Sequence, residues 1–127
     1  MGFRLGDLHN MATSLLIPPS LERFLELTTD REQTIAGNMA NVDTPGYHTR
    51  DVNFKQTLLS ASSTGDEAEL TPVVSRVHGL LERPDGNNVD LDRESMLLAQ
   101  AQLQYQLGAQ LVKSNFHQLL SAINGGS

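Results

Sequence analysis

The chain has 127 residues, the size of one domain, and its composition is 39% hydrophobic but only 5% aromatic, with no Trp. So few aromatic anchors favour thin helix–helix packing over a bulky globular core. The formal net charge is −6, and the nine Lys and Arg residues are scattered, which disfavours nucleic-acid binding. Cys is absent, so disulfides and thiolate metal sites are excluded.

Residues 1–18 are expected to form a flexible or partner-ordered N-terminal segment. A short docking helix is an open alternative, because several apolar residues fall near a helical stripe: Leu5, Leu8, Ala12, Leu15 and Leu16. No apolar run reaches the roughly 18 residues of a membrane span. The run 15–17 is too short for the core of a secretory signal, so we expect no cleavable signal peptide.

A first helix is predicted from about Pro19 to Asn41. Ser20 is a suitable N-cap, and Glu22 places negative charge in the first turn, where the helix dipole favours it. Apolar residues follow a three–four spacing, and those expected to pack are Leu21, Phe24, Leu25, Ile35 and Met39. This pattern fits an ordinary amphipathic helix or a coiled-coil-like seam for another long helix.

The stretch Ala36-Gly-Asn-Met-Ala-Asn-Val-Asp-Thr-Pro-Gly-Tyr47 is expected to end this helix. Pro45 disfavours helical geometry at Thr44, and Pro45-Gly46 suits the central positions of a type II turn. Asn38 and Asn41 lie three residues apart on one helix face. Their amides can bond terminal carbonyls, cap the helix or reach another chain.

Residues 48–88 are expected to be an extended or loop region with at most a small β-hairpin. Residues 55–60 are compatible with a single helical turn, and residues 60–72 are predicted to be a linker. The β-prone stretch 73–77 is expected to pair loosely with residues 79–82. Residues 84–88, Pro-Asp-Gly-Asn-Asn, have the composition of a turn.

A second helix is predicted from Leu91 to about Ile123, with Asp90 as N-cap and negative charge at Asp92 and Glu94 in its first turn. About 30 helical residues would span roughly 45 Å, which is long for this chain. Its expected packing residues are Leu91, Leu98, Tyr105, Val112, Phe116 and Leu119. Further Leu residues and small residues at 99, 101, 108 and 109 predict a second partner helix.

The sequence offers no recognisable catalytic or metal-binding constellation. The four His residues share no helical i, i+3 or i+4 spacing, and no Ser stands in a nucleophile elbow. We therefore expect no enzyme activity and no cofactor. The fold class predicted is mainly α, with residues 19–47 and 89–124 packed as an antiparallel, coiled-coil-like core domain. Surplus apolar surface on such a core indicates an assembly protein.

Two separated motifs carry a family resemblance. The first resembles the signature of bacterial flagellar rod, hook and hook-associated proteins: Ala36, Asn38, Ala40, Asn41, Thr44, Pro45, Gly46 and Tyr47. The second, residues 83–94, is similar to the proximal rod type of this family, and its helix-start residues are Asn87, Val89, Asp90 and Glu94. Residues 102–107 also fit the proximal type better than distal rod and hook proteins. Gly37, Met39 and His48 depart from the commonest family choices.

The resemblance implies a structural subunit of the proximal rod of the flagellar basal body, which transmits torque to hook and filament. It implies export by the flagellar type III apparatus to a periplasmic rod. The implied partners are other copies of the chain, other rod proteins and the membrane-ring adaptor protein. The alternative is a small acidic export chaperone or helix-binding adaptor, because its composition and helices would be the same.

Overall fold

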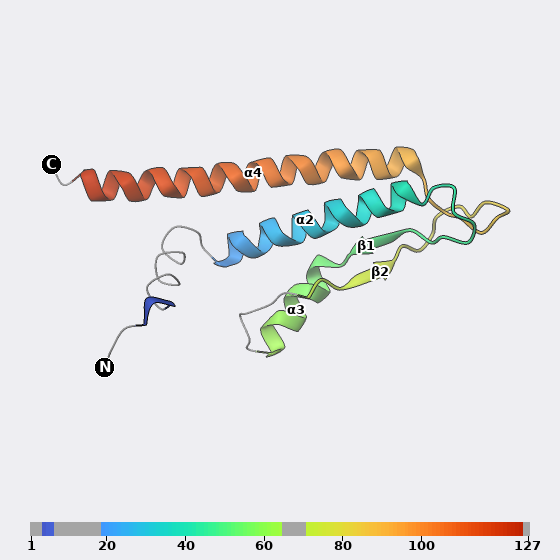
Figure 1. The fold of residues 1–127 in the computed structure, drawn as a ribbon, viewed down its shortest axis with the longest axis horizontal. Coiled ribbons are helices and arrows are strands. Elements are labelled where there is room, and N and C mark those ends of the chain that lie inside the picture. Colours follow the sequence, from blue (N-terminus) through green and yellow to red (C-terminus); the bar gives the residue numbers. More distant parts are fainter. Residues whose placement is uncertain (1–3, 7–18, 65–70, 126–127) are drawn as a thin grey trace.

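The computed structural model describes residues 4–6, 19–64 and 71–125, and the elements run in the order α2 (Pro19–Ala40), β1 (Arg50–Val52), α3 (Phe54–Thr64), β2 (Val74–Arg76) and α4 (Leu91–Asn124). Figure 1 shows α2 and α4 side by side, with the small elements along the other side of α2. This confirms the predicted mainly α fold, with long helices toward both ends of the chain and a two-stranded antiparallel sheet in the middle. The expectation for residues 1–18 lies outside the described residues except at 4–6, where residues 5 and 6 are helical.

Helix α2 begins at Pro19, so Ser20 is not the N-cap that we predicted but an exposed residue of the first turn. Proline suits the first helical position because its missing N–H would have no partner there. Further along, the hydroxyls of Thr28, Thr29 and Thr34 each donate to the carbonyl four residues earlier, at 2.7, 3.0 and 2.9 Å. These bonds satisfy polar groups that would otherwise compete with the helix.

Small residues of α4 bring the two long helices close together. Glu94, Ala101 and Gly108 are the buried residues of α4 and follow a seven-residue spacing. A Cβ placed on Gly108 would lie 2.5 Å from Cδ2 of Leu25, so the α2 side chain occupies the space that glycine leaves. The heptad spacing confirms that α4 presents a continuous seam to α2.

The middle of the chain differs from the prediction. Strand β1 pairs antiparallel with β2, with Arg50 opposite Arg76 and Val52 opposite Val74, so residues 79–82 are not the partner strand. The helical turn expected at 55–60 is an 11-residue helix that continues to Thr64. Asn53 explains its start, because its side-chain oxygen accepts from the Gln56 backbone N–H at 3.0 Å, as an N-cap does.

Polar contacts tie the small elements to α2 and to one another. The guanidinium of Arg31 on α2 forms two hydrogen bonds with the Asp51 carboxylate on β1, at 3.0 and 3.1 Å. The Thr57 hydroxyl of α3 accepts from the Val73 backbone N–H at 2.9 Å. The β1–β2 ribbon is therefore held in one position against α2.

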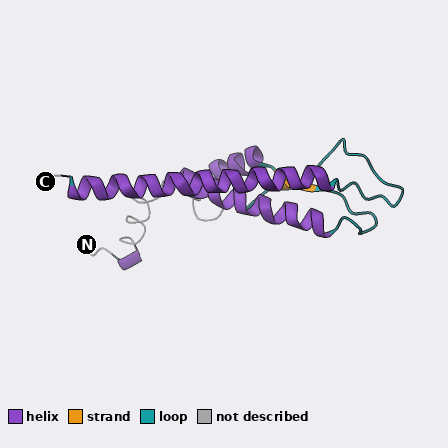
Figure 2. Ribbon diagram, turned by 90° about the horizontal axis from the view of Figure 1, so that it is seen from above, coloured by secondary structure: helices purple, strands orange, loops and turns teal. Residues whose placement is uncertain are grey.

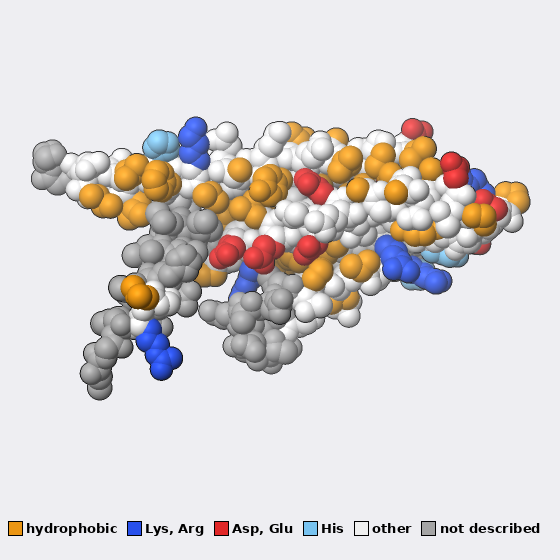
Figure 3. Space-filling model, viewed as in Figure 1, with side chains coloured by type: hydrophobic (Ala, Val, Ile, Leu, Met, Phe, Trp, Pro, Cys, Tyr) orange, Lys and Arg blue, Asp and Glu red, His pale blue; other side chains and the backbone are white. Residues whose placement is uncertain are grey.

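Helix α4 has 34 residues and α2 has 22, so α4 continues past the first turn of α2 (Figure 2). Figure 3 shows hydrophobic side chains exposed along α4. None of the helices in the described ranges is both long and apolar enough to span a membrane.

Candidate functional site

The two sequence motifs meet at one end of the molecule. Residues 41–47 follow α2, residues 83–90 precede α4, and the two segments lie together beyond the ends of the helices (Figure 1). The Gly46 backbone N–H donates to the Asp85 carbonyl at 2.9 Å, and the Asn88 N–H donates to the Tyr47 carbonyl at 3.3 Å. We call these two segments, together with Asn38 of α2 and Glu94 of α4, the clasp.

Two glycines allow the backbones of the clasp to approach. Gly46 has φ +75°, and the Tyr47 N–H donates to the Thr44 carbonyl at 3.2 Å, which confirms the predicted turn. Gly86 has φ +84°, and a Cβ there would lie 3.3 Å from the Gly46 Cα. Gly86 therefore meets two requirements of glycine at once, a left-handed backbone and a close neighbour.

Asn87 joins the start of α4 to the end of α2. Its amide nitrogen donates to the carbonyls of Asn41 and Thr44, at 2.9 and 2.8 Å, while its side-chain oxygen accepts from the Val89 N–H at 2.8 Å. The side chain is fully buried. Because carbonyls at a helix C-terminus have no partner within the helix, Asn87 supplies the donor that the end of α2 requires.

Asn38 is the centre of the buried part of the clasp. Its amide nitrogen donates to the Arg50 carbonyl at 2.7 Å and to Glu94 Oε2 at 3.1 Å. Its oxygen accepts from the Tyr47 hydroxyl at 2.9 Å and from the Arg50 N–H at 3.1 Å. The Asn38 side chain is fully buried within its own chain. It therefore does not reach another chain, which was one of the roles that the sequence left open.

Glu94 is more than the helix-start charge that we predicted, because its side chain is fully buried. One oxygen accepts from Asn38 and the other from Nη1 of Arg93, at 2.8 Å. Burial of a carboxylate is tolerated when both oxygens have donors. Glu94 lies seven residues, or about two helical turns, before Ala101, so both residues lie on the same face of α4. This spacing was the sequence signal that the Glu94 side chain faces α2.

Thr49 follows the first segment of the clasp and bonds to Asn88 of the second, and neither residue was a predicted site residue. The Thr49 N–H donates to Asn88 Oδ1 at 2.7 Å, and the Thr49 hydroxyl donates to the Asn88 carbonyl at 3.3 Å. Both residues are buried. Arg83 also reaches across, where its guanidinium donates to the Val42 carbonyl. The composition of residues 84–88 predicted a loop, but it could not indicate which segment of the chain this loop contacts.

Most of the remaining signature and helix-start residues lie on the outside of the clasp. Asn41 donates from its amide to the Gly37 carbonyl at 2.8 Å and accepts from the Thr44 hydroxyl at 3.0 Å. At the start of α4, the Asp90 carboxylate accepts from the N–H groups of Asp92 and Arg93, which confirms it as N-cap. Val89 is buried, whereas the exposed signature residues are Ala36, Ala40, Thr44, Pro45 and Gly46.

The predicted packing residues divide into two groups. Ile35 is buried, and seven are half-buried: Leu21, Phe24, Leu25, Met39, Leu98, Val112 and Leu119. Leu91, Tyr105 and Phe116 are 44, 43 and 45% exposed, so they are not enclosed between the helices of one chain. Leu27 is also buried and was not among the predicted packing residues. Ala101 and Gly108, two of the small residues that the sequence marked for close helix packing, are buried in the seam with α2, and Glu94 belongs to the same seven-residue series.

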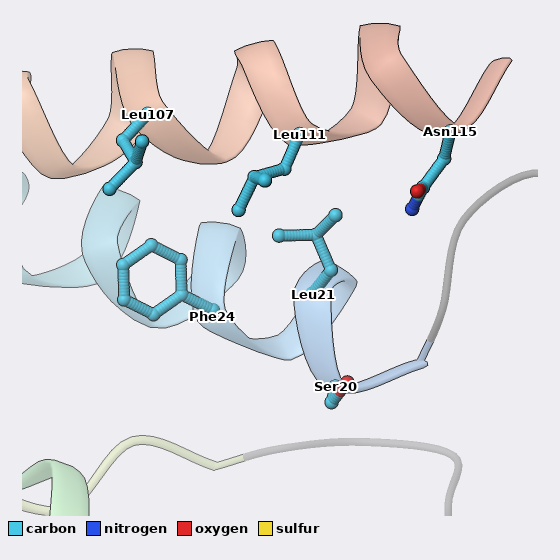
Figure 4. Close-up of a pocket in the computed structure, with 6 residues that line it drawn as sticks. All are labelled: Ser20, Leu21, Phe24, Leu107, Leu111 and Asn115. Atoms are coloured by element: carbon cyan, nitrogen blue, oxygen red, sulfur yellow. The ribbon is translucent and has the colours of Figure 1, made fainter. Parts of the chain in front are cut away.

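An open hollow of about 410 Å³ lies between the first turns of α2 and the distal half of α4. Figure 4 shows Leu107 and Leu111 of α4 pointing toward Phe24 and Leu21 of α2, with Ser20 and Asn115 at the edge. Its lining has no titratable side chain, so it offers no acid–base chemistry. Across the described ranges, no three His, Asp or Glu residues are grouped as a metal site would require.

The site as a whole can position helices, because the polar side chains of the clasp bond to one another and to the backbone. The clasp is therefore a structural joint that sets how α2 and α4 are presented to other molecules.

No protein-family model matches the chain. Curated proteins with the printed name "Flagellar basal body rod protein FlgB" do match. The Salmonella typhimurium (strain LT2) protein is 31% identical over 123 residues, covering 81% of this chain and 89% of the relative. The Bacillus subtilis (strain 168) protein is 32% identical over 120 residues, covering 84% and 92%. The Escherichia coli (strain K12) protein is 29% identical over 123 residues, with 81% and 89% covered. This chain, with its two clasped helices, belongs to the FlgB family of flagellar basal body rod proteins.

Proposed function

We propose that this chain is a structural subunit of the proximal rod, assembling through its long helices into a tubular shaft that transmits torque from the membrane ring to hook and filament. Residues 19–47 and 89–124 form the core domain in this proposal, and residues 48–88 form an appendage beside it. The role requires no catalysis and no cofactor.

The observation that carries the proposal is the apolar surface of α4 that its own chain leaves exposed. Leu103 is 66% exposed, Leu107 61% and Ile123 70%, and Phe116 and Leu120 are also exposed. Exposed apolar side chains in such number on one helix indicate a contact surface for other proteins. Burial of each would contribute on the order of 1–2 kcal/mol, which favours association.

The charge distribution of α4 supports the same use. Between Ser95 and Asn124, Lys113 is the only residue with a formal charge; Gln, Leu, Ala and Ser dominate. A helix facing water alone usually has charged residues on its outer face. An uncharged outer face is suited to burial against further helices, because no charge has to be desolvated.

The clasp explains how such a subunit can transmit force. Asn38, Asn87 and Glu94 are buried and hydrogen-bonded across the joint between the helices. A joint of this kind resists a change in the angle between α2 and α4, because any such change would leave buried polar groups without partners. Many helix contacts per subunit, each weak, would add to the stiffness of the shaft.

The partners proposed are other copies of the chain, other rod proteins and the membrane-ring adaptor protein, after export by the flagellar type III apparatus. The proposed location is the periplasmic rod of the basal body. Residues 1–18 are proposed to become ordered by such partners.

The test is electron microscopy of basal bodies purified from a strain deleted for this protein and from its parent. Rings without a rod, together with lost motility, are expected. Intact rods and hooks in the deletion strain would overturn the proposal and favour the export-chaperone alternative.

Point variants test the clasp as part of this function. Asn41→Asp removes the amide donor to the Gly37 carbonyl, and Pro45→Ala removes the residue that predisposes the turn. Both are expected to reduce motility and rod assembly more than the solubility of the isolated chain. Gln33→Ala, at an exposed position of α2, is the control. Normal motility in both clasp variants would contradict the role assigned to the clasp.

A further inference from the structure

Two arginines face each other across the β1–β2 ribbon. Arg50 and Arg76 are register partners, and both are exposed. Within the described part of the chain, neither guanidinium forms a hydrogen bond or an ion pair. Like charges directly opposite one another destabilise a strand pair. The fold thus brings together two arginines that lie far apart in the sequence. We call the surface formed by Arg50 and Arg76 the basic ribbon face.

Helix α2 has the opposite feature on its outer side. Glu22, Glu26 and Asp30 recur every four residues, and none of their carboxylates forms an ion pair with another described residue. Glu22 and Glu26 are exposed and Asp30 is half-buried. Like charges at this spacing destabilise an isolated helix. We call these three residues the acidic row.

Within the described residues, the two features form no ion pair with each other. The ribbon is held beside the second half of α2, through Asp51 to Arg31 and through the Arg50 carbonyl to Asn38. Figure 3 shows acidic side chains gathered along the first half of α2 and basic side chains farther along the same face, over the ribbon. Among the described residues, the side chains of Arg50, Arg76, Glu22 and Glu26 are all exposed.

We propose that the basic ribbon face of one copy docks on the acidic row of α2 in another copy. The inference rests on the proposed function, since it assigns two surfaces through which rod subunits meet. The spacings agree, because Cβ atoms of opposed strand residues lie about 5 Å apart and those of i, i+4 helix residues about 6 Å apart. Two guanidiniums can then face two carboxylates, which suits arginine and its planar donors.

The contact joins two different surfaces, so a copy bound through its ribbon keeps its acidic row for a third copy. Contacts of this heterologous kind build open helical series when the rotation does not close. Exposed ion pairs are individually weak and are screened by salt. The contact would therefore select orientation and neighbour, while the apolar surface of α4 supplies most of the affinity.

The experiment uses charge reversal in the full chain, expressed in the deletion strain. Arg50→Glu with Arg76→Glu, and separately Glu22→Lys with Glu26→Lys, are expected to reduce motility and the number of rod-bearing basal bodies. The chain with all four substitutions is expected to restore both, because the attraction is regained with signs exchanged. Glu82→Lys, which reverses an exposed charge outside both surfaces and outside α4, is the control. Far-ultraviolet circular dichroism of each purified variant confirms that it is folded.

A binding measurement on purified chains gives the second readout. The Arg-reversed variant and the Glu-reversed variant are each expected to self-associate on the order of tenfold more weakly than the parent at low salt. The difference in self-association between each reversed variant and the parent is expected to become smaller at high salt, because salt screens exposed charges. Failure of the four-residue variant to recover, or parental behaviour of both reversed variants, would overturn the contact. Rods that persist when the gene is deleted would instead overturn the proposed function, so the two failures are distinguishable.

Discussion

Replacing Asn38 by Ala tests whether the clasp is held by its buried polar contacts. The substitution removes four hydrogen bonds, two donated by the amide nitrogen and two accepted by the oxygen. It leaves four groups without the Asn38 partner: the Tyr47 hydroxyl, the Arg50 N–H, the Arg50 carbonyl and one Glu94 oxygen. Glu94 is fully buried, so water does not replace the lost donor without opening the joint.

The magnitude follows from these orphaned groups. A buried polar group without a partner costs about 1–3 kcal/mol, and a charged one costs more. We expect Asn38→Ala to lower the free energy of unfolding by about 3–5 kcal/mol, a large part of the 5–15 kcal/mol typical of a domain. Tyr47→Phe removes only one of the four bonds and should cost about 0.5–1.5 kcal/mol.

The assay is urea unfolding of the isolated chain, followed by far-ultraviolet circular dichroism. Gln33→Ala is the matched control, because this exposed residue of the same helix is expected to change stability by less than about 0.5 kcal/mol. The double variant of Asn38 and Tyr47 should cost less than the sum of the single variants, since they share a bond. A free energy of unfolding of the Asn38→Ala variant within about 0.5 kcal/mol of that of the parent would refute the reasoning.

Three further predictions concern local geometry, measured by the same unfolding assay. Gly86→Ala should lower the free energy of unfolding by about 1–2 kcal/mol, because φ at this position is +84°. Gly37→Ala should raise the free energy of unfolding by up to about 1 kcal/mol, because a Cβ at this position of α2 would meet open space. Equal effects at both positions would contradict this reasoning. Gly108→Val should cost about 1–3 kcal/mol, because its side chain would overlap Leu25, and an unchanged unfolding midpoint would show that the helices separate freely. Asp90→Ala should cost about 0.5–2 kcal/mol, while Asp90→Asn, which retains the cap, should not.

Features that depend on neighbouring residues were predictable from the sequence. Pro45-Gly46 ends the helical region in a turn, and Asp90 caps α4, because both effects operate within a few residues. The absence of Pro over the long Leu-, Gln- and Ala-rich stretch likewise predicted one long helix. The length of α3 was underestimated, although it also depends on neighbouring residues, because Asn53 is a residue type that favours the N-cap position.

Pairing across the chain was beyond such reasoning. Strand β1 pairs with β2, which follows α3 in the chain, and local sequence patterns did not identify this partner. The predicted packing residues Leu91 and Tyr105 belong to a seven-residue series rotated by about 60° from the buried series of Glu94, Ala101 and Gly108. Apolar residues surround α4 almost completely, so periodicity alone could not choose a face.

The sequence by itself determined two long helices, the turn between the first helix and the middle region, and the motifs that place the chain in its family. Only the tertiary structure decided that Asn38 and Glu94, 56 residues apart, meet in one buried network. The physical reason is that capping and turn formation depend on atoms a few bonds away. Burial of a carboxylate or the pairing of two arginines depends on which distant segments the whole fold brings together.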